Sequence, residues 1–132
     1  MAKTLVISHR GANRYAPQNT MPAFERAAQL GADGFETDVH LTKDGVPVII
    51  HNHTINETSN GMGSVASYTF DELRKLDFGS YYSPAFKGTQ IPSLDEFLEL
   101  SKQADIEVMN IELKGPKNKK TDVVPVIIDA VK

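Results

Sequence analysis

Carboxylate side chains stand in two strand-like segments of the sequence. Glu36 and Asp38 are two residues apart in one segment, so both project from the same face of an extended chain. Glu112 stands near the end of a later segment of the same kind. Three carboxylates that face one cavity repel one another unless a cation neutralises them, and all-oxygen ligands suit Mg²⁺ or Ca²⁺ rather than Zn²⁺. An isolated Glu-x-Asp pair is more often a solvated strand face, but the third carboxylate favours a metal site.

Histidines and basic side chains follow the same strand-like segments. His9 and His51 each end an apolar run, and an imidazole exchanges protons near neutral pH, so the pair suits general acid and base catalysis. Arg10 offers a bidentate fork and Lys114 a compact charge, and both suit a phosphoryl group. An ion pair with the carboxylates is an equally good interpretation of Lys114. We expect the remaining histidines, at positions 40 and 53, to be non-catalytic.

The segments that must position these residues alternate between strand and helix. Apolar β-branched runs predict strands over residues 4–8, 34–42, 46–50 and 106–113. Capping signals predict helices that begin after Thr20, Thr69 and Ser93, and a last apolar helix is expected from residue 121. This order predicts an α/β fold with a largely parallel sheet, whose strands end in one active-site edge.

The turn at residues 43–45 leaves the position of His51 open. If it closes a tight hairpin, Thr42 pairs with Val46 and Thr37 pairs with His51. His51 then faces away from the carboxylates, because successive residues of a strand face opposite sides. A site that contains His51 needs a bulge or a parallel crossover, so we expect that this segment is not a tight regular hairpin.

Composition limits the class of protein. The chain has 132 residues, which is typical of one domain, and it has no cysteine, which excludes disulfides and thiolate metal sites. The formal net charge of −3 argues against a nucleic-acid partner. No stretch is long and apolar enough for a transmembrane segment. We expect a soluble cytoplasmic protein, with a removed leader as the open alternative.

Six motifs, in order along residues 4–114, resemble those of the glycerophosphodiester phosphodiesterases. They are His-Arg-Gly at 9–11 with Pro-Gln-Asn-Thr at 17–20, Glu-Thr-Asp-Val at 36–39, Lys-Asp-Gly-Val-Pro-Val at 43–48 with His51, the stretch 60–79, Ile-Pro-Ser-Leu at 91–94 and Asn-Ile-Glu-Leu-Lys at 110–114. Two positions depart from the family pattern, because Gln18 and Asn52 each replace a usual carboxylate. We expect these departures to alter the electrostatics around the site.

The resemblance implies a TIM-type (β/α)8 barrel, of which residues 1–132 carry roughly the first half as the N-terminal part of a single domain. Such barrels need about 250 residues. Residues 52–92 would be a small insertion. The implied reaction is the metal-dependent hydrolysis of a glycerophosphodiester to an alcohol and glycerol 3-phosphate.

The resemblance also implies a role for each candidate residue. One divalent cation, Mg²⁺ or Ca²⁺, would be held by Glu36, Asp38 and Glu112. The acid/base pair would be His9 and His51, and the phosphate would be bound by Arg10 and Lys114.

Two alternatives to this function stay open. One is a lysophospholipase D or sphingomyelinase-type phosphodiesterase, and the other is a non-catalytic half-barrel domain that needs a partner segment. Half a barrel leaves unpaired strand edges and an apolar interior that faces water. We therefore expect that the 132 residues alone do not form an active monomer, and that the C-terminal half of the barrel or a second copy completes it.

Overall fold

The structure, a computed structural model, describes residues 5–113. Its elements in chain order are β1 (Ile7–His9), α1 (Met21–Gln29), β2 (Gly34–Leu41), β3 (Pro47–Ile49), α2 (Phe70–Leu73), α3 (Leu94–Gln103) and β4 (Val108–Leu113). Short 3-10 turns lie at Val65–Ser67 and Pro84–Phe86. Lys114 and the helix predicted from residue 121 lie outside the described residues.

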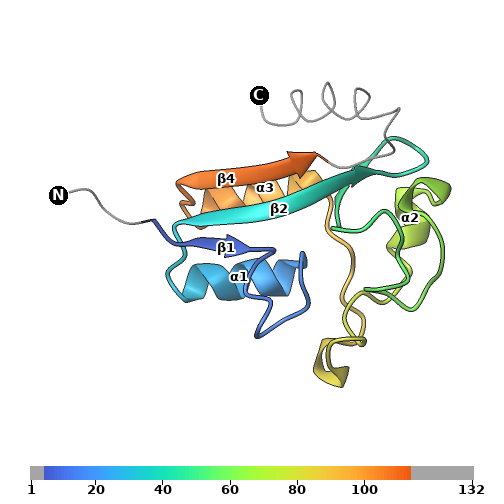
Figure 1. Cartoon of the computed structure of the whole chain (residues 1–132), viewed down its shortest axis with the longest axis horizontal. Helices are drawn as coiled ribbons and strands as arrows, with labels where there is room; N and C mark the ends of the chain where they lie inside the picture. Colours follow the sequence, from blue (N-terminus) through green and yellow to red (C-terminus); the bar gives the residue numbers. More distant parts are fainter. Residues whose placement is uncertain (1–4, 114–132) are drawn as a thin grey trace.

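β2 is the central strand of the sheet, and the parallel strands β1 and β4 lie on its two sides (Figure 1). His9 of β1 lies opposite Glu36, and Glu112 of β4 lies opposite Asp38. Helix α1 connects β1 to β2, and α3 precedes β4, so both parallel pairs contain the helical crossover that parallel strands require. The predicted α/β class with a largely parallel sheet is therefore confirmed.

The helices begin at the predicted capping residues. Thr20 accepts a hydrogen bond from the backbone of Ala23, and Thr69 and Ser93 each form a complete capping box. Helix α2 is a single turn that ends at Leu73. Within residues 5–113, no helix has both the length and the apolarity needed to cross a membrane.

Three fully buried phenylalanines fix which face of β2 meets the helices. Phe24 of α1, Phe35 of β2 and Phe97 of α3 lie with ring centroids 4.9–5.8 Å apart. Because Phe35 has the opposite parity to Glu36 and Asp38, both carboxylates project from the face that the helices do not cover. The core of the molecule thus determines the direction of the acidic side chains.

Residues 52–92 form an irregular segment with its own small core. Val48 and Ile50 of the hairpin pack against buried side chains from this segment: Ile55, Val65, Leu73, Phe78 and Ile91. Val48 lies opposite His40 in the β2–β3 ladder and shares its face, which is also the face of Asp38. The irregular segment therefore borders the side of the sheet that carries the carboxylates.

The two ends of this segment meet at β3. The backbone N–H of Ile49 donates to the carbonyl of Pro92 at 2.9 Å, and Val48 forms an isolated antiparallel bridge with Ser93. The chain thus leaves the hairpin and returns to the same strand before α3 begins.

Residues 43–45 do form a tight hairpin, so the contrary expectation was wrong. The backbone of Thr42 donates to Val46 at 3.0 Å, and Gly45 donates back to Thr42 at 3.0 Å. Gly45 has a φ of 80°, a left-handed conformation that glycine adopts without strain. The turn fixes the register in which position 51 would lie opposite Thr37.

Candidate active site

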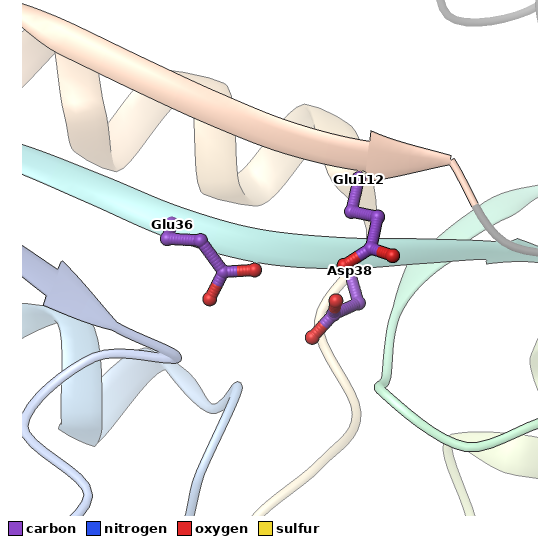
Figure 2. Close-up of side chains that lie close together, drawn as sticks. All are labelled: Glu36, Asp38 and Glu112. Atoms are coloured by element: carbon purple, nitrogen blue, oxygen red, sulfur yellow. The ribbon is translucent and has the colours of Figure 1, made fainter.

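Three carboxylates from two parallel strands converge on one point. Glu36 and Asp38 of β2 and Glu112 of β4 each offer an oxygen, and these oxygens all lie within 4.8 Å of one another. Figure 2 shows the three side chains projecting from the same side of the β2–β4 pair. The i, i+2 spacing places Glu36 and Asp38 on one face, and the parallel register brings Glu112 beside Asp38.

The acidic cluster is partly withdrawn from water. The side chain of Asp38 is 1% exposed and that of Glu36 is 16% exposed, whereas Glu112 lies at the surface. Burial, and next the negative charge of Asp38, raise the pKa of Glu36, while His9 and Arg10 lower it in part. The pKa of Glu36 remains above its ordinary value, because burial and Asp38 together outweigh His9 and Arg10.

Two buried oxygens of this cluster fit a bound cation. Glu36 Oε2 and Asp38 Oδ1 have no hydrogen-bond partner among the residues that the structure describes. Buried polar atoms are normally satisfied, and carboxylate oxygens at this separation are ligands that a hard divalent cation binds. The all-oxygen donor set and the burial both fit such an ion.

His9 and Arg10 reach the cluster from the end of β1. His9 Nε2 lies 3.2 Å from Glu36 Oε2, and its side chain is 63% exposed, so it is open to a bound molecule. Arg10 Nε lies 3.8 Å from Asp38 Oδ2. Arg10 adopts a φ of 57°, a strained conformation for a residue with a side chain.

The glycine after Arg10 permits this sharp turn. Gly11 has a φ of 80°, and a Cβ atom there would lie 2.8 Å from backbone and side-chain carbons of Ala23. Only glycine tolerates both the conformation and the close approach to α1. The glycine therefore places His9 and Arg10 against β2.

His51 leaves the sheet because β1 already occupies that part of the edge of β2. The backbone of Arg10 donates to Glu36 and that of Ile50 donates to Asp38, so β1 and β3 meet end to end on one side of β2. No room is left for residue 51 to continue the ladder opposite Thr37. The chain turns away after Ile50, and strand alternation no longer sets the direction of the His51 side chain.

The contacts of His51 differ from those of His9. Its carbonyl lies 3.0 Å from His40 Nε2, and its Nδ1 lies 2.6 Å from Asn52 Oδ1. It also lines a small cavity together with Asn19 and Ile91. The structure thus brings His9 and Arg10 into contact with the carboxylates and places His51 in the adjoining cavity, while Lys114 lies outside the described residues.

The two departures from the family pattern contact the candidate site residues. Gln18 accepts a hydrogen bond from Arg10 Nη1 at 3.0 Å, and Asn52 contacts His51. At both positions a neutral amide stands where the family usually has a carboxylate. Gln18 and Asn52 keep these contacts without adding a negative charge.

Sequence reasoning missed the roles of two buried polar residues. His40 was given no role by the sequence, but it is 6% exposed and its ring contacts the backbone of His51. Asn19 belongs to the Pro-Gln-Asn-Thr motif, which assigns it no role, yet its side-chain amide forms hydrogen bonds with Asp38 and Thr37. The spacing of two residues between Asp38 and His40 could have shown that both side chains share one face of β2. The contacts of Asn19 depend on the geometry of a loop, which the sequence does not show.

The fold and the site together define a class: an incomplete α/β barrel with a carboxylate cluster on its parallel strands. The model of the glycerophosphoryl diester phosphodiesterase family matches residues 9–128. The chain therefore belongs to this family, as the motifs suggested.

Relatives from distant organisms show the same similarity. The chain is 50% identical over 113 residues to the glycerophosphodiester phosphodiesterase of Caldanaerobacter subterraneus, a match that covers 86% of this chain and 46% of that protein. It is 34% identical over 118 residues to human glycerophosphodiester phosphodiesterase 1, which covers 88% of this chain and 35% of that protein. The chain thus spans half or less of the length of these relatives.

Solved structures confirm the predicted half-barrel. A glycerophosphodiester phosphodiesterase from Agrobacterium tumefaciens superposes with a TM-score of 0.84 at 39% identity, covering 97% of this chain and 54% of that one. A phosphodiesterase from Oleispira antarctica, solved in complex with the product sn-glycerol 3-phosphate, superposes with a TM-score of 0.92 at 32% identity. That match covers 97% of this chain and 51% of the other.

Proposed function

We propose that this chain is the N-terminal part of a single barrel domain that hydrolyses glycerophosphodiesters to an alcohol and glycerol 3-phosphate with the help of one divalent cation. The observation that carries the proposal is the convergence of Glu36, Asp38 and Glu112 within 4.8 Å, beside His9 and Arg10. Membership of the family supports the reaction class. The product complex of the Oleispira relative supports a small glycerophosphodiester as substrate.

Glu36, Asp38 and Glu112 would hold the cation, Mg²⁺ or Ca²⁺. When bound, such a cation offsets negative charge on the phosphoryl oxygens and favours ionisation of the attacking hydroxyl. The carboxylates suit this role because Asp38 Oδ1 is buried without a hydrogen-bond partner among residues 5–113, and Glu36 Oε2 has only the ion pair with His9 at 3.2 Å. Their negative charge also favours a cation over any anionic ligand at the same point.

His9 and His51 would carry the proton transfers. Cleavage of a phosphodiester requires that the nucleophile, water or the substrate's glycerol hydroxyl, loses a proton and that the leaving alkoxide gains one. Two observations support this pair: His9 stands exposed beside Glu36, and His51 lines a small cavity together with Asn19, which bonds to Asp38.

Arg10 and Lys114 would bind the phosphate. The guanidinium of Arg10 is held between Gln18 and Asp38 and is 22% exposed, so it is oriented and still accessible. The neutral amide at position 18 adds no further negative charge beside Arg10, which favours attraction of the phosphodiester anion by the guanidinium. Lys114 follows Glu112 by two residues in the sequence and is included on the strength of the family motif alone.

A direct assay tests the proposal. A full-length protein that contains this chain is freed of metal with a chelator, supplied with Mg²⁺ or Ca²⁺, and incubated with glycerophosphocholine. We expect release of glycerol 3-phosphate, measured with a coupled dehydrogenase, only when the cation is present. Release of phosphocholine and glycerol would contradict the assigned bond cleavage, and equal activity in chelator would contradict the role of the cation.

A further inference from the structure

Asn19 is a buried polar residue whose side chain spans the edge of β2. It is 3% exposed and has a φ of 56°, in the left-handed region that asparagine tolerates better than most residues. Its Nδ2 donates to Asp38 Oδ2 at 3.1 Å, and its Oδ1 accepts from Thr37 Oγ1 at 2.9 Å. Thr37 and Asp38 project from opposite faces of the strand. Asn19 therefore forms hydrogen bonds with side chains on both faces of β2, at the place where β1 and β3 meet.

The two carboxylate oxygens of Asp38 have different surroundings. Oδ2 accepts the hydrogen bond from Asn19 and lies 3.8 Å from Arg10 Nε. Oδ1 is buried and has no hydrogen-bond partner among the described residues. Because the side chain of Asp38 is only 1% exposed, bulk water does not supply the missing hydrogen-bond partner of Oδ1. One oxygen of Asp38 is occupied and the other is left for a ligand.

The orientation of the Asn19 amide is fixed from both sides. The Asp38 carboxylate accepts hydrogen bonds only, so it selects the amide nitrogen of Asn19. Thr37 then donates its hydroxyl proton to the remaining amide oxygen. The backbone N–H of Asn19 donates to the carbonyl of Arg10 at 2.9 Å, which ties the same residue to the loop that carries Arg10. A wrongly turned amide would place an oxygen against the carboxylate.

We propose that Asn19 is a positioning residue that holds Asp38 in an orientation in which only Oδ1 is presented to the cation, and that Thr37 locks Asn19 from the opposite face of the strand. The inference rests on the proposed cation site. A single carboxylate oxygen suits the small octahedral Mg²⁺, whereas Ca²⁺ also accepts both oxygens of one carboxylate. Asn19 thus favours the smaller cation.

Cation binding without substrate provides the test. Mg²⁺ alone and Ca²⁺ alone are titrated by calorimetry into the chelator-stripped full-length protein and into its Asn19→Ala and Thr37→Val variants. We expect Asn19→Ala to weaken Mg²⁺ binding at least about tenfold and Ca²⁺ binding by a smaller factor. Thr37→Val, which removes no group from the carboxylate face, should shift Mg²⁺ affinity in the same direction.

Thr42→Val is the matched control. Thr42 is a buried threonine of the same hairpin, 5% exposed, and its hydroxyl bonds within the turn to Asp44 and Val46. Both valine variants are expected to lower the melting temperature, but only Thr37→Val should change cation affinity.

The outcomes separate this inference from the proposed function. Wild-type affinity for Mg²⁺ in both Asn19→Ala and Thr37→Val would overturn the positioning role of Asn19. An equal loss of Mg²⁺ and Ca²⁺ binding would overturn the one-oxygen orientation of Asp38. Failure of the wild-type protein to bind either cation would instead contradict the cation site itself. If Asn19→Ala does not fold, Thr37→Val and its Thr42→Val control still decide the question.

Discussion

Asp38 on β2 and Glu112 on β4 stand directly opposite each other in the parallel register, with both carboxylates on one face of the sheet. Such a pair is repulsive when both groups are ionised. Glu36 adds a third carboxylate beside this pair. The acidic cluster therefore costs stability in the metal-free protein, and a cation that binds there should restore it.

Replacement of Glu36 by Gln should stabilise the metal-free protein at neutral pH. The pKa of Glu36 is raised above 4.5 in the folded state, mainly by burial and then by Asp38. The folded state therefore binds the proton more tightly than the unfolded state, and its stability falls as pH rises through the window above 4.5. Urea unfolding between pH 4 and 8 in chelator should show a flatter profile for Glu36→Gln.

Addition of Mg²⁺ provides the control for this variant. The wild-type protein should gain stability and Glu36→Gln should gain less, because a ligand has been removed. A Glu36→Gln protein that is less stable than the wild type in chelator at pH 7 would contradict the burial argument.

Loss of either candidate acid/base residue should abolish most turnover. We expect His9→Ala and His51→Ala, made in a full-length protein, each to lower kcat by about a hundredfold or more, because each removes one proton transfer. His53→Ala is a suitable control, since His53 is exposed and was not assigned to the reaction. Near-normal turnover of His9→Ala or His51→Ala would remove that residue from the mechanism.

Asn52 should act through His51. Asn52→Ala removes the 2.6 Å contact with His51 Nδ1 and is expected to lower kcat about tenfold, as for other residues that orient a catalytic group. Asn52→Asp keeps an oxygen at the same place and should retain most of the activity. Steady-state kinetics of the two variants would show the difference, and an Asn52→Ala enzyme as active as the wild type would mean that the contact is dispensable.

The aromatic core that orients β2 should be costly to disrupt. Phe97→Ala removes a fully buried ring that contacts both Phe24 and Phe35, and we expect a loss of about 3–5 kcal/mol in the free energy of unfolding. Met62→Ala, at a side chain 74% exposed, should change it by less than about 0.5 kcal/mol. Chemical denaturation measures both, and similar losses in the two variants would contradict the assigned core.

The 132 residues expressed alone should associate. Within residues 5–113, β1 and β4 pair only with β2, and apolar side chains such as Val6, Ile7 and Met109 are 43–59% exposed. Such edges and apolar surface favour pairing with other chains. Light scattering should detect oligomers without hydrolytic activity, whereas a uniform active monomer would refute the expectation.

Patterns local in the sequence predicted most of the fold and the acidic cluster. Capping residues such as Thr20 and Ser93 located the helices, because a cap depends on atoms only three residues away. The spacing of Glu36 and Asp38 predicted a shared face, because strand alternation is equally local. These predictions needed no knowledge of the tertiary structure.

The position of His51 depended on a contact between distant parts of the chain. The sequence suggested that a tight hairpin excludes His51 from the carboxylate face, and this holds only if the ladder continues past Ile50. It ends there because Arg10 bonds to Glu36 on the same edge of β2. Asn19 was missed for a similar reason, since the link between a loop amide and both faces of a strand has no periodic signature.

The hydrogen bond from Ile49 to Pro92 closes the irregular segment against β3, so this segment is structurally separate from the strands that carry the carboxylates. Because the irregular segment departs from the hairpin and returns to it at one point, its length and composition can change while the strands that carry Glu36, Asp38 and Glu112 keep their register. The segment supplies Phe78 and Ile91 to the cavity that His51 lines, but none of the three carboxylates. Exchange of this segment beyond Asn52 between relatives would therefore be a means to change the substrate preference while the proposed catalytic residues stay the same.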